Sequence, residues 1–366
     1  PPPPHPPTTP PHPRRQHSPP RGRPAGVHRL TLPSKRWQVP PPVTAEALAR
    51  LSDQPSLIVQ LLHNRNIHDP GEARAFLQGQ TPGYSPFELK GMYQAVDRLL
   101  EAVRSGESIA VYGDFDTDGV TATALLVQAL SALGAQVRPY IPNRVDEGYG
   151  LNLDALRKLW RQGVRLVVTV DCGIRSIDEV EQASRGLDLI VTDHHTVGDE
   201  LPPAVAVINP KQPGCIYPFK LLAGVGVAYK LAEGLLLARK RLGQPAALAA
   251  EDLLDFVALG TVADLVPLTG ENRELVRRGL EKLKLPRPGV EALMADAGLR
   301  RGAVDATAIG FRLGPRLNAA GRNDTAMLAY NLLSSTSLLE TRVLAGLLGR
   351  LNQRRQELTE QTVAEA

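Results

Sequence analysis

Acidic side chains and a pair of adjacent histidines follow short apolar runs at several points of this 366-residue sequence. The runs are SIAVYGDFDTDG, RLVVTVDCG and LDLIVTDHH, and a further acid stands in ALGTVADLVPL, near the end of an apolar helix. The side chains that share this placement are Asp114, Asp116, Asp118, Asp171, Asp193, His194, His195 and Asp264. Clustered carboxylates repel one another, so folding them together requires a cation or shared protons. These residue types therefore predict a metal site.

The donor atoms of this set indicate which metals would bind. Oxygen ligands with one or two imidazoles and no thiolate favour Mn²⁺ or Mg²⁺ over structural zinc. The ligands suffice for two ions, which together can activate water and clamp a phosphoryl group during in-line displacement. Taken singly, each aspartate could instead cap a helix or form a turn. We expect Cys172, next to Asp171, to be a buried structural cysteine and not a nucleophile.

Two other acidic motifs resemble parts of this pattern. DFDTDGVTATAL has acids at positions 1, 3 and 5 of a calcium loop, but Leu125 stands where a bidentate glutamate is required, which excludes an EF-hand. A strand followed by DxD also fits the haloacid-dehalogenase phosphatases, which use an aspartyl nucleophile. That interpretation leaves VTDHH unexplained, so the two-metal interpretation is preferred.

Alternating strands and helices must position these side chains. Apolar, β-branched runs predict strands at 108–114, 135–142, 165–171, 187–193 and 204–209. A helix is expected over 92–106, before the first strand, and further helices between the strands, for example over 120–134, after a turn through the acidic motif, and over 151–163. This alternation predicts an α/β fold with a doubly wound parallel sheet. Ligands of such sheets bind at the carboxyl ends of the strands, where the acids stand.

The rest of the chain differs in composition from this α/β part. Residues 1–36 are rich in proline and arginine and carry a net charge of +7, which leaves −3 for the remainder. They are predicted to be a disordered tail, with a weak electrostatic tether to nucleic acid as the alternative. We expect a catalytic domain over 37–335, all-helical beyond residue 217, and a long linker helix over 336–366.

Composition also bears on the compartment. Cys172 and Cys215 form no CxxC pair, which suits a reducing cytoplasm. No apolar stretch approaches the roughly 18 residues that a membrane span needs. We therefore expect a cytoplasmic protein with no membrane partner.

The ordered set GDFDTDG, VDCG, TDHH and GTVADLVPL resembles the DHH phosphoesterase superfamily. IPNRVDEGYGLN (141–152) and GFRLGPRLNAAGR (310–322) are more specific, because they resemble the RecJ-type single-strand-specific exonucleases. The resemblance runs from about residue 50 to the C-terminus. It implies a 5′→3′ exonuclease that degrades single-stranded DNA to mononucleotides with Mn²⁺ or Mg²⁺ in recombination and repair. It further implies a monomer, with single-strand-binding protein and a RecQ-type helicase as partners.

The same resemblance assigns roles to individual residues. Its implied metal ligands are Asp114, Asp116, Asp118, Asp171, His194 and Asp264. Asp193 would ligate a metal or orient His194, and His195 would face the scissile phosphate. The side chains expected to contact the strand are Arg144, Tyr149, Arg316, Asn318 and Arg322. For the two later arginines the alternative is a structural ion pair.

The chain departs from the family pattern in two places. Tyr112 stands where many relatives have a histidine, so Asp114 is the natural substitute ligand. The C-terminal DHHA1 module and an OB-fold are not recognisable, so we expect a fragment with an open groove for the strand. Two alternative functions remain: a DHH phosphodiesterase acting on oligoribonucleotides, cyclic dinucleotides or pyrophosphate, and a non-catalytic Cdc45-like scaffold.

Overall fold

The computed structural model describes residues 38–79, 83–144, 146–323 and 325–365. The chain divides into two compact units, Pro1–Ile67 and His68–Ala366. The described part of the first unit holds two short helices, α1 (Ala45–Arg50) and α2 (Ser56–His63). The side chain of Thr44 begins α1 by accepting a hydrogen bond from the N–H of Ala47. The predicted tail, residues 1–36, lies outside the described residues.

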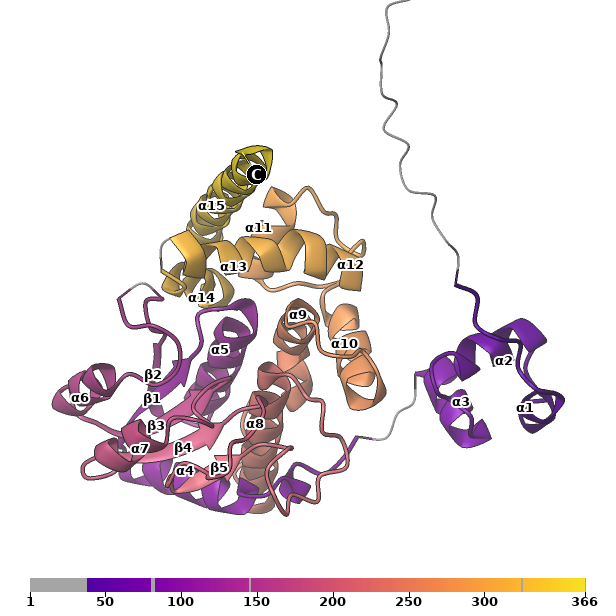
Figure 1. The fold of residues 1–366 in the computed structure, drawn as a ribbon. Helices are drawn as coiled ribbons and strands as arrows, with labels where there is room; N and C mark the ends of the chain where they lie inside the picture. Colours follow the sequence, from indigo (N-terminus) through magenta and orange to yellow (C-terminus); the bar gives the residue numbers. More distant parts are fainter. Residues whose placement is uncertain (1–37, 80–82, 145, 324, 366) are drawn as a thin grey trace, which may run out of the picture. The chain divides into compact units, whose positions relative to one another are not determined.

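The second unit contains a five-stranded parallel sheet with strand order β2-β1-β3-β4-β5 (Figure 1). Its strands are β1 (Ser108–Gly113), β2 (Gln136–Tyr140), β3 (Val164–Val170), β4 (Asp188–Thr192) and β5 (Ala206–Ile208). Four strands lie within their predicted ranges and β3 begins one residue before its own, so the parallel-sheet prediction is confirmed. The strand order reverses between β1 and β3. This is the switch point at which such sheets bind ligands, and Asp114 and Asp171 directly follow these two strands.

Helices cover both faces of the sheet, as predicted for a doubly wound fold. One face packs its aliphatic side chains against α4 (Met92–Ser105), α5 (Thr117–Ala132) and α8 (Gly224–Arg241). The other face packs against α6 (Leu153–Arg161) and α7 (Ile177–Ala183). Because both faces are buried, the central strands β1, β3 and β4 are almost continuously apolar.

The start of α5 differs from the prediction. We expected a turn through the acidic motif and a helix from about residue 120, but α5 begins at Thr117. Asp116 is its N-cap and accepts a hydrogen bond from the N–H of Gly119 at 3.0 Å. The capping interaction pulls the helix start forward, because an aspartate at this position satisfies an otherwise unpaired amide. Asp118 therefore lies inside the first helical turn.

The chain after the sheet is helical, also as predicted. Its elements are η2 (Ala250–Leu253), α9 (Leu254–Ala263), α10 (Gly270–Lys282), α11 (Pro288–Asp296), α12 (Ala306–Ala308), the π-helical turn η3 (Ile309–Leu313), α13 (Gly314–Asn323), α14 (Met327–Ser334) and α15 (Leu338–Glu365). Two elements before the sheet complete the unit, α3 (Pro70–Gln78) and η1 (Pro86–Glu88). The apolar helix α9 packs between α5, α8 and α10, and α15 lies against α11, α13 and α14 (Figure 1). Through α9, the helical part delivers Asp264 to the sheet edge.

Among the described residues, no helix combines the length and the apolar character needed to cross a bilayer.

Candidate metal centre

The loop between β1 and α5, together with the first turn of α5, contributes three carboxylates, Asp114, Asp116 and Asp118. Asp114 is buried, and its Oδ1 accepts a hydrogen bond from the N–H of Phe115 at 2.7 Å. Asp118 is buried too, and it accepts hydrogen bonds from the N–H groups of Gly224 at 2.7 Å and Val225 at 2.9 Å. Those two amides begin α8, where unpaired N–H groups favour a negative charge. The carboxylate of Asp118 is thus held in place by a helix more than a hundred residues away.

Asp171 follows β3 and lies at the centre of the cluster. Its backbone has φ 62°, a left-handed conformation that aspartate tolerates better than most side chains. The side chain is buried against the start of α8, where a Cβ at Gly224 would overlap its carboxylate. Glycine at position 224 is therefore required for Asp171 to occupy this site.

Asp193, His194 and His195 follow β4 and divide into two functions. The Nε2 atom of His194 lies 3.1 Å from Asp171 Oδ1, 3.6 Å from Asp264 Oδ2 and 3.9 Å from Asp118 Oδ2. The Nδ1 atom of His195 instead lies 2.7 Å from Asp193 Oδ1. His194 therefore faces the acids, while His195 is held by its neighbour.

The contacts of Asp193 differ from the expectation that it ligates a metal or orients His194. Its Oδ1 accepts the backbone N–H groups of His194 and His195, and its Oδ2 accepts the N–H of Ile174 at 3.0 Å. With the bond to the His195 ring, both carboxylate oxygens are occupied. Asp193 thus orients the ring of His195, and its contact with His194 is to the backbone.

The donor atoms form three overlapping groups. In each group the donor atoms lie within 4.8 Å of one another. The groups are Asp171–His194–His195, Asp118–His194–Asp264 and Asp114–Asp116–Asp171. All six predicted ligands therefore fall within one cluster, together with His195. Because the first group shares His194 with the second and Asp171 with the third, the cluster could hold two adjacent cations.

Burial changes the protonation of the cluster. It raises the pKa of Asp114 to about 7 and that of Asp264 to about 6, with the negative charge of Asp116 adding to both shifts. Burial likewise raises the pKa values of Asp118 and Asp171, which also repel other carboxylates. The same burial lowers the pKa of His194 to about 4, so its imidazole is neutral and able to bind a cation.

The pKa values of Asp193 and His195 shift in the directions that favour their charged forms. Burial disfavours the Asp193 anion, but the hydrogen bond and charge of His195 outweigh burial and lower the pKa of Asp193. The same hydrogen bond raises the pKa of His195 against the effect of burial. The two groups therefore stabilise each other as an ion pair beside the metal ligands.

The cluster fits a hard divalent cation. Three of its buried atoms, Asp171 Oδ1, His194 Nε2 and Asp264 Oδ2, have no hydrogen-bond partner within the described part of the chain. Buried polar atoms without partners are costly, and a cation would satisfy all three. Cys172 is buried with its thiol against the carbonyl oxygen of Tyr112, and burial raises its pKa, so it is the structural cysteine we predicted.

The sequence analysis missed several residues that support the cluster. The start of α8 binds Asp118, as described above. Asn209 and Lys211, in the loop after β5, donate hydrogen bonds to the backbone carbonyl oxygens of His195 and His194. The INPK stretch after the fifth strand could have pointed to this loop, because polar residues there reach the same sheet edge. Nothing in the AGVG stretch signals the contact with Asp118.

Two residues predicted to contact the strand, Tyr149 and Arg144, lie against aromatic rings near the cluster. Tyr149 is 61% exposed and its ring meets that of His195 edge to face, with centroids 6.2 Å apart. The guanidinium of Arg144 lies over the ring of Phe115, 5.1 Å from its centroid. A cavity of about 500 Å³ borders Tyr149, Asp193 and His195. This cavity is large enough to hold part of a substrate next to the histidine.

The three predicted residues of α13 have different surroundings. Arg316 forms an ion pair with Asp296 at 2.9 Å, which is the structural alternative we considered. The Oδ1 atom of Asn318 accepts a hydrogen bond from the N–H of Thr117 at 2.7 Å, so it faces the metal loop. Arg322 is exposed and stands four positions after Asn318, on the same side of the helix. Of the three, Arg322 is the one whose side chain is exposed.

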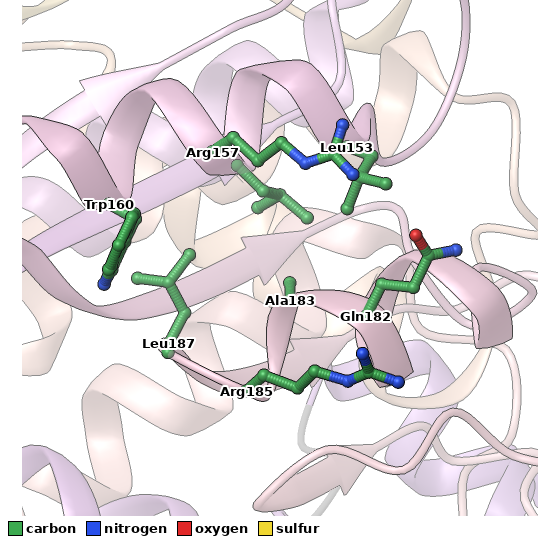
Figure 2. A pocket seen from close by; sticks show the side chains of 9 residues that line it. Leu153, Arg157, Trp160, Gln182, Ala183, Arg185 and Leu187 are labelled. Carbon is green, nitrogen blue, oxygen red and sulfur yellow. The ribbon is translucent and has the colours of Figure 1, made fainter.

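A smaller pocket lies away from this cluster, between α6 and α7. Its volume is about 190 Å³, and Leu153, Trp160, Leu187 and two arginines, Arg157 and Arg185, contribute to its wall (Figure 2). None of its lining residues belongs to the metal cluster. The pocket is therefore separate from the candidate metal centre.

The sequence is similar to one family model and to several curated proteins. The family model described as "DHH family, N-terminal domain" matches residues 108–261. The single-stranded-DNA-specific exonuclease RecJ of Bacillus subtilis is 43% identical over 337 residues, which are 90% of this chain and 42% of that protein. RecJ of Escherichia coli is 42% identical over 332 residues, covering 88% of this chain and 56% of the relative. The chain thus spans about half the length of the curated relatives it matches.

Solved structures of RecJ proteins are similar to this chain in both fold and sequence. A crystal structure of exonuclease RecJ bound to manganese matches with a TM-score of 0.69 and 38% identity, covering 77% of this chain and 71% of that one. RecJ of Thermus thermophilus in complex with Mn²⁺ matches with a TM-score of 0.73 and 35% identity, covering 87% and 45%. A parallel sheet with acids after β1 and β3 and paired histidines after β4 is the arrangement of a DHH domain. Within that class, the chain belongs to the RecJ family, as its motifs suggested.

Proposed function

We propose that this chain carries a metal-dependent exonuclease activity that hydrolyses the phosphodiester bonds of single-stranded DNA to mononucleotides. The observation that carries the proposal is the cluster of carboxylates around His194, with His195 held by Asp193 at its edge. The names of the relatives, single-stranded-DNA-specific exonucleases, support the substrate. The 5′→3′ polarity and the roles in recombination and repair rest on the family resemblance.

The cofactor we propose is Mn²⁺ or Mg²⁺, with room for two ions. The oxygen-rich donor set and its unpartnered buried atoms support this choice, as do related structures with bound manganese or magnesium. A bound divalent ion supplies an activated water and neutralises charge on the phosphate. The proposed ligands are the six that were predicted from the sequence, shared among the three groups.

The remaining residues act on the substrate directly. We assign His195 to the scissile phosphate, because Asp193 fixes its Nδ1 and leaves Nε2 for a phosphate oxygen or the leaving oxygen. Tyr149 offers an exposed ring on which a base can stack. Arg144 and Arg322 are proposed to contact the backbone of the strand, since a guanidinium can make paired bonds to phosphate oxygens.

We retain the wider predictions as proposals. Residues 37–335 would form the catalytic domain and 336–366 a linker helix. A monomer acting in the cytoplasm, with single-strand-binding protein and a RecQ-type helicase as partners, follows from the family resemblance and the DNA substrate.

The test is a timed digestion of single strands labelled at the 5′ or the 3′ end, with Mn²⁺ present. We expect early loss of the 5′ label as mononucleotide, and no activity in Asp171→Ala or His194→Ala. Asp154→Ala removes an exposed acid of α6 and serves as the matched control. Cleavage of dinucleotides alone would favour a small-substrate DHH phosphodiesterase, and activity in both site variants would remove the metal assignment.

A further inference from the structure

Thr117 lies between two predicted metal ligands, Asp116 and Asp118, at the first position of α5. Its side chain is almost completely buried. The backbone N–H of a first helical residue has no partner within its own helix. Asp116 caps the N–H of Gly119 and not that of Thr117. The amide of Thr117 therefore needs an acceptor from elsewhere in the fold.

Asn318 of α13 supplies this acceptor. Its Oδ1 accepts the Thr117 N–H at 2.7 Å and lies 2.8 Å from the Thr117 hydroxyl. The same hydroxyl lies 3.2 Å from the backbone carbonyl oxygen of Gly314. One amide oxygen thus fixes both the backbone and the side chain of the residue between the two ligands. We expected Asn318 to contact phosphate, but this oxygen is already engaged by Thr117.

The contact extends over the length of α13. Gly314, Asn318 and Gly321 are spaced by four and three residues, so they share one face of the helix. At Gly321 a Cβ would overlap the carbonyl oxygen of Phe115, the residue before Asp116. Only glycine lets α13 approach the metal loop this closely. Arg316 stands roughly 200° around the helix from Gly314 and forms its ion pair with Asp296 there.

We propose that α13 is a clamp on the metal-binding loop and that Asn318 is a positioning residue. It acts through Thr117, whose fixed backbone sets the separation of the Asp116 and Asp118 carboxylates. Partners of this kind, which orient metal ligands without touching the metal, typically change metal affinity or activity 10- to 100-fold when removed. The inference rests on the proposed function only in taking this cluster as the hydrolytic site.

The first test measures Mn²⁺ binding without DNA, by titration calorimetry on the full chain. Asn318→Leu removes the acceptor at similar volume and should raise the Mn²⁺ dissociation constant about 10- to 100-fold. Asn318→Asp keeps an acceptor oxygen and should bind Mn²⁺ within a few-fold of the wild type. Asn331→Leu makes the same change at an exposed position of α14 and should have no effect. Unchanged affinity in Asn318→Leu, or equal loss in the Asp variant, overturns the proposal.

The second test separates positioning from a phosphate contact. If Asn318 acts through the metal loop, raising Mn²⁺ should restore much of the kcat of Asn318→Leu, with the KM for single-stranded DNA near that of the wild type. A raised KM that Mn²⁺ does not correct would overturn the clamp. Should the Leu variant fail to fold, Gly321→Ala tests the same face by pushing on the Phe115 carbonyl. A normal Mn²⁺ dissociation constant in Gly321→Ala would contradict the proposal.

The binding measurement also stands apart from the exonuclease assignment. If the wild type binds Mn²⁺ but cleaves no single strand, the proposed function fails. The affinities of the Asn318 variants would still decide whether α13 positions the loop.

Discussion

Asp114→Asn should stabilise the metal-free protein, although it alters a predicted ligand. Burial, together with the charge of Asp116, raises the pKa of Asp114 from 3.8 to about 7. A carboxyl group with a raised pKa destabilises the folded state only when it is ionised. The destabilisation is therefore absent below the unfolded pKa of 3.8 and fully present above the folded pKa of about 7.

The size of the effect follows from the shift. Because one pKa unit corresponds to about 1.4 kcal/mol, ionised Asp114 costs the folded state about 4 kcal/mol near pH 8. Near pH 5 the group is largely protonated in the folded protein, and the cost falls to about 2 kcal/mol. Asparagine carries no charge and keeps an oxygen that can accept the N–H of Phe115. The gain in unfolding free energy should thus be about 2–3 kcal/mol larger near pH 8 than near pH 5.

Urea unfolding in the presence of a chelator measures this difference. Asp154→Asn, at an exposed position of α6, is the control and should show no comparable dependence on pH. A gain that is equal at both pH values, or a loss of stability near pH 8, would refute the electrostatic reasoning. With saturating Mn²⁺ the order should reverse, because a ligand that binds only the folded state stabilises the wild type more strongly.

Three further predictions concern catalysis, pH and the strand. His195→Asn should lower the single-turnover rate constant for cleavage at least about 100-fold. The Mn²⁺ affinity measured by calorimetry should stay within a few-fold of the wild type, because the Nδ1 of His195 is bound to Asp193 and not to the other acids. The rise in melting temperature caused by Mn²⁺ should be larger near pH 8 than near pH 5.5, because raised carboxyl pKa values make protons compete with metal; an equal rise would contradict this. Arg322→Ala should raise the KM for single-stranded DNA several-fold without loss of stability, whereas Arg316→Ala should lower the unfolding free energy by about 1 kcal/mol through its lost ion pair. The opposite pattern would exchange the roles of the two arginines.

The parallel sheet and the set of acids that gather at its edge can be predicted from the sequence alone. Short β-branched runs alternating with helices dictate a parallel sheet, and the carboxyl ends of parallel strands lie at one edge. Any acid that directly follows such a strand, like Asp114, Asp171 or Asp193, must therefore reach that edge. Asp264 could be added because a carboxylate at the end of an apolar helix needs a partner. These conclusions depend only on local pattern and on one rule of topology.

Which of these side chains contact one another depends on the tertiary fold. Whether Asp193 meets the ring of His194 or of His195 depends on how the turn after β4 is held, and Ile174 from another loop takes part in that. The hydrogen bond from the N–H of Gly224, at the start of α8, to Asp118 joins residues 106 positions apart. The bond from Thr117 to Asn318 spans 201 positions. Hydrophobic periodicity records only which face of an element is buried, so it carries no information about such distant polar partners.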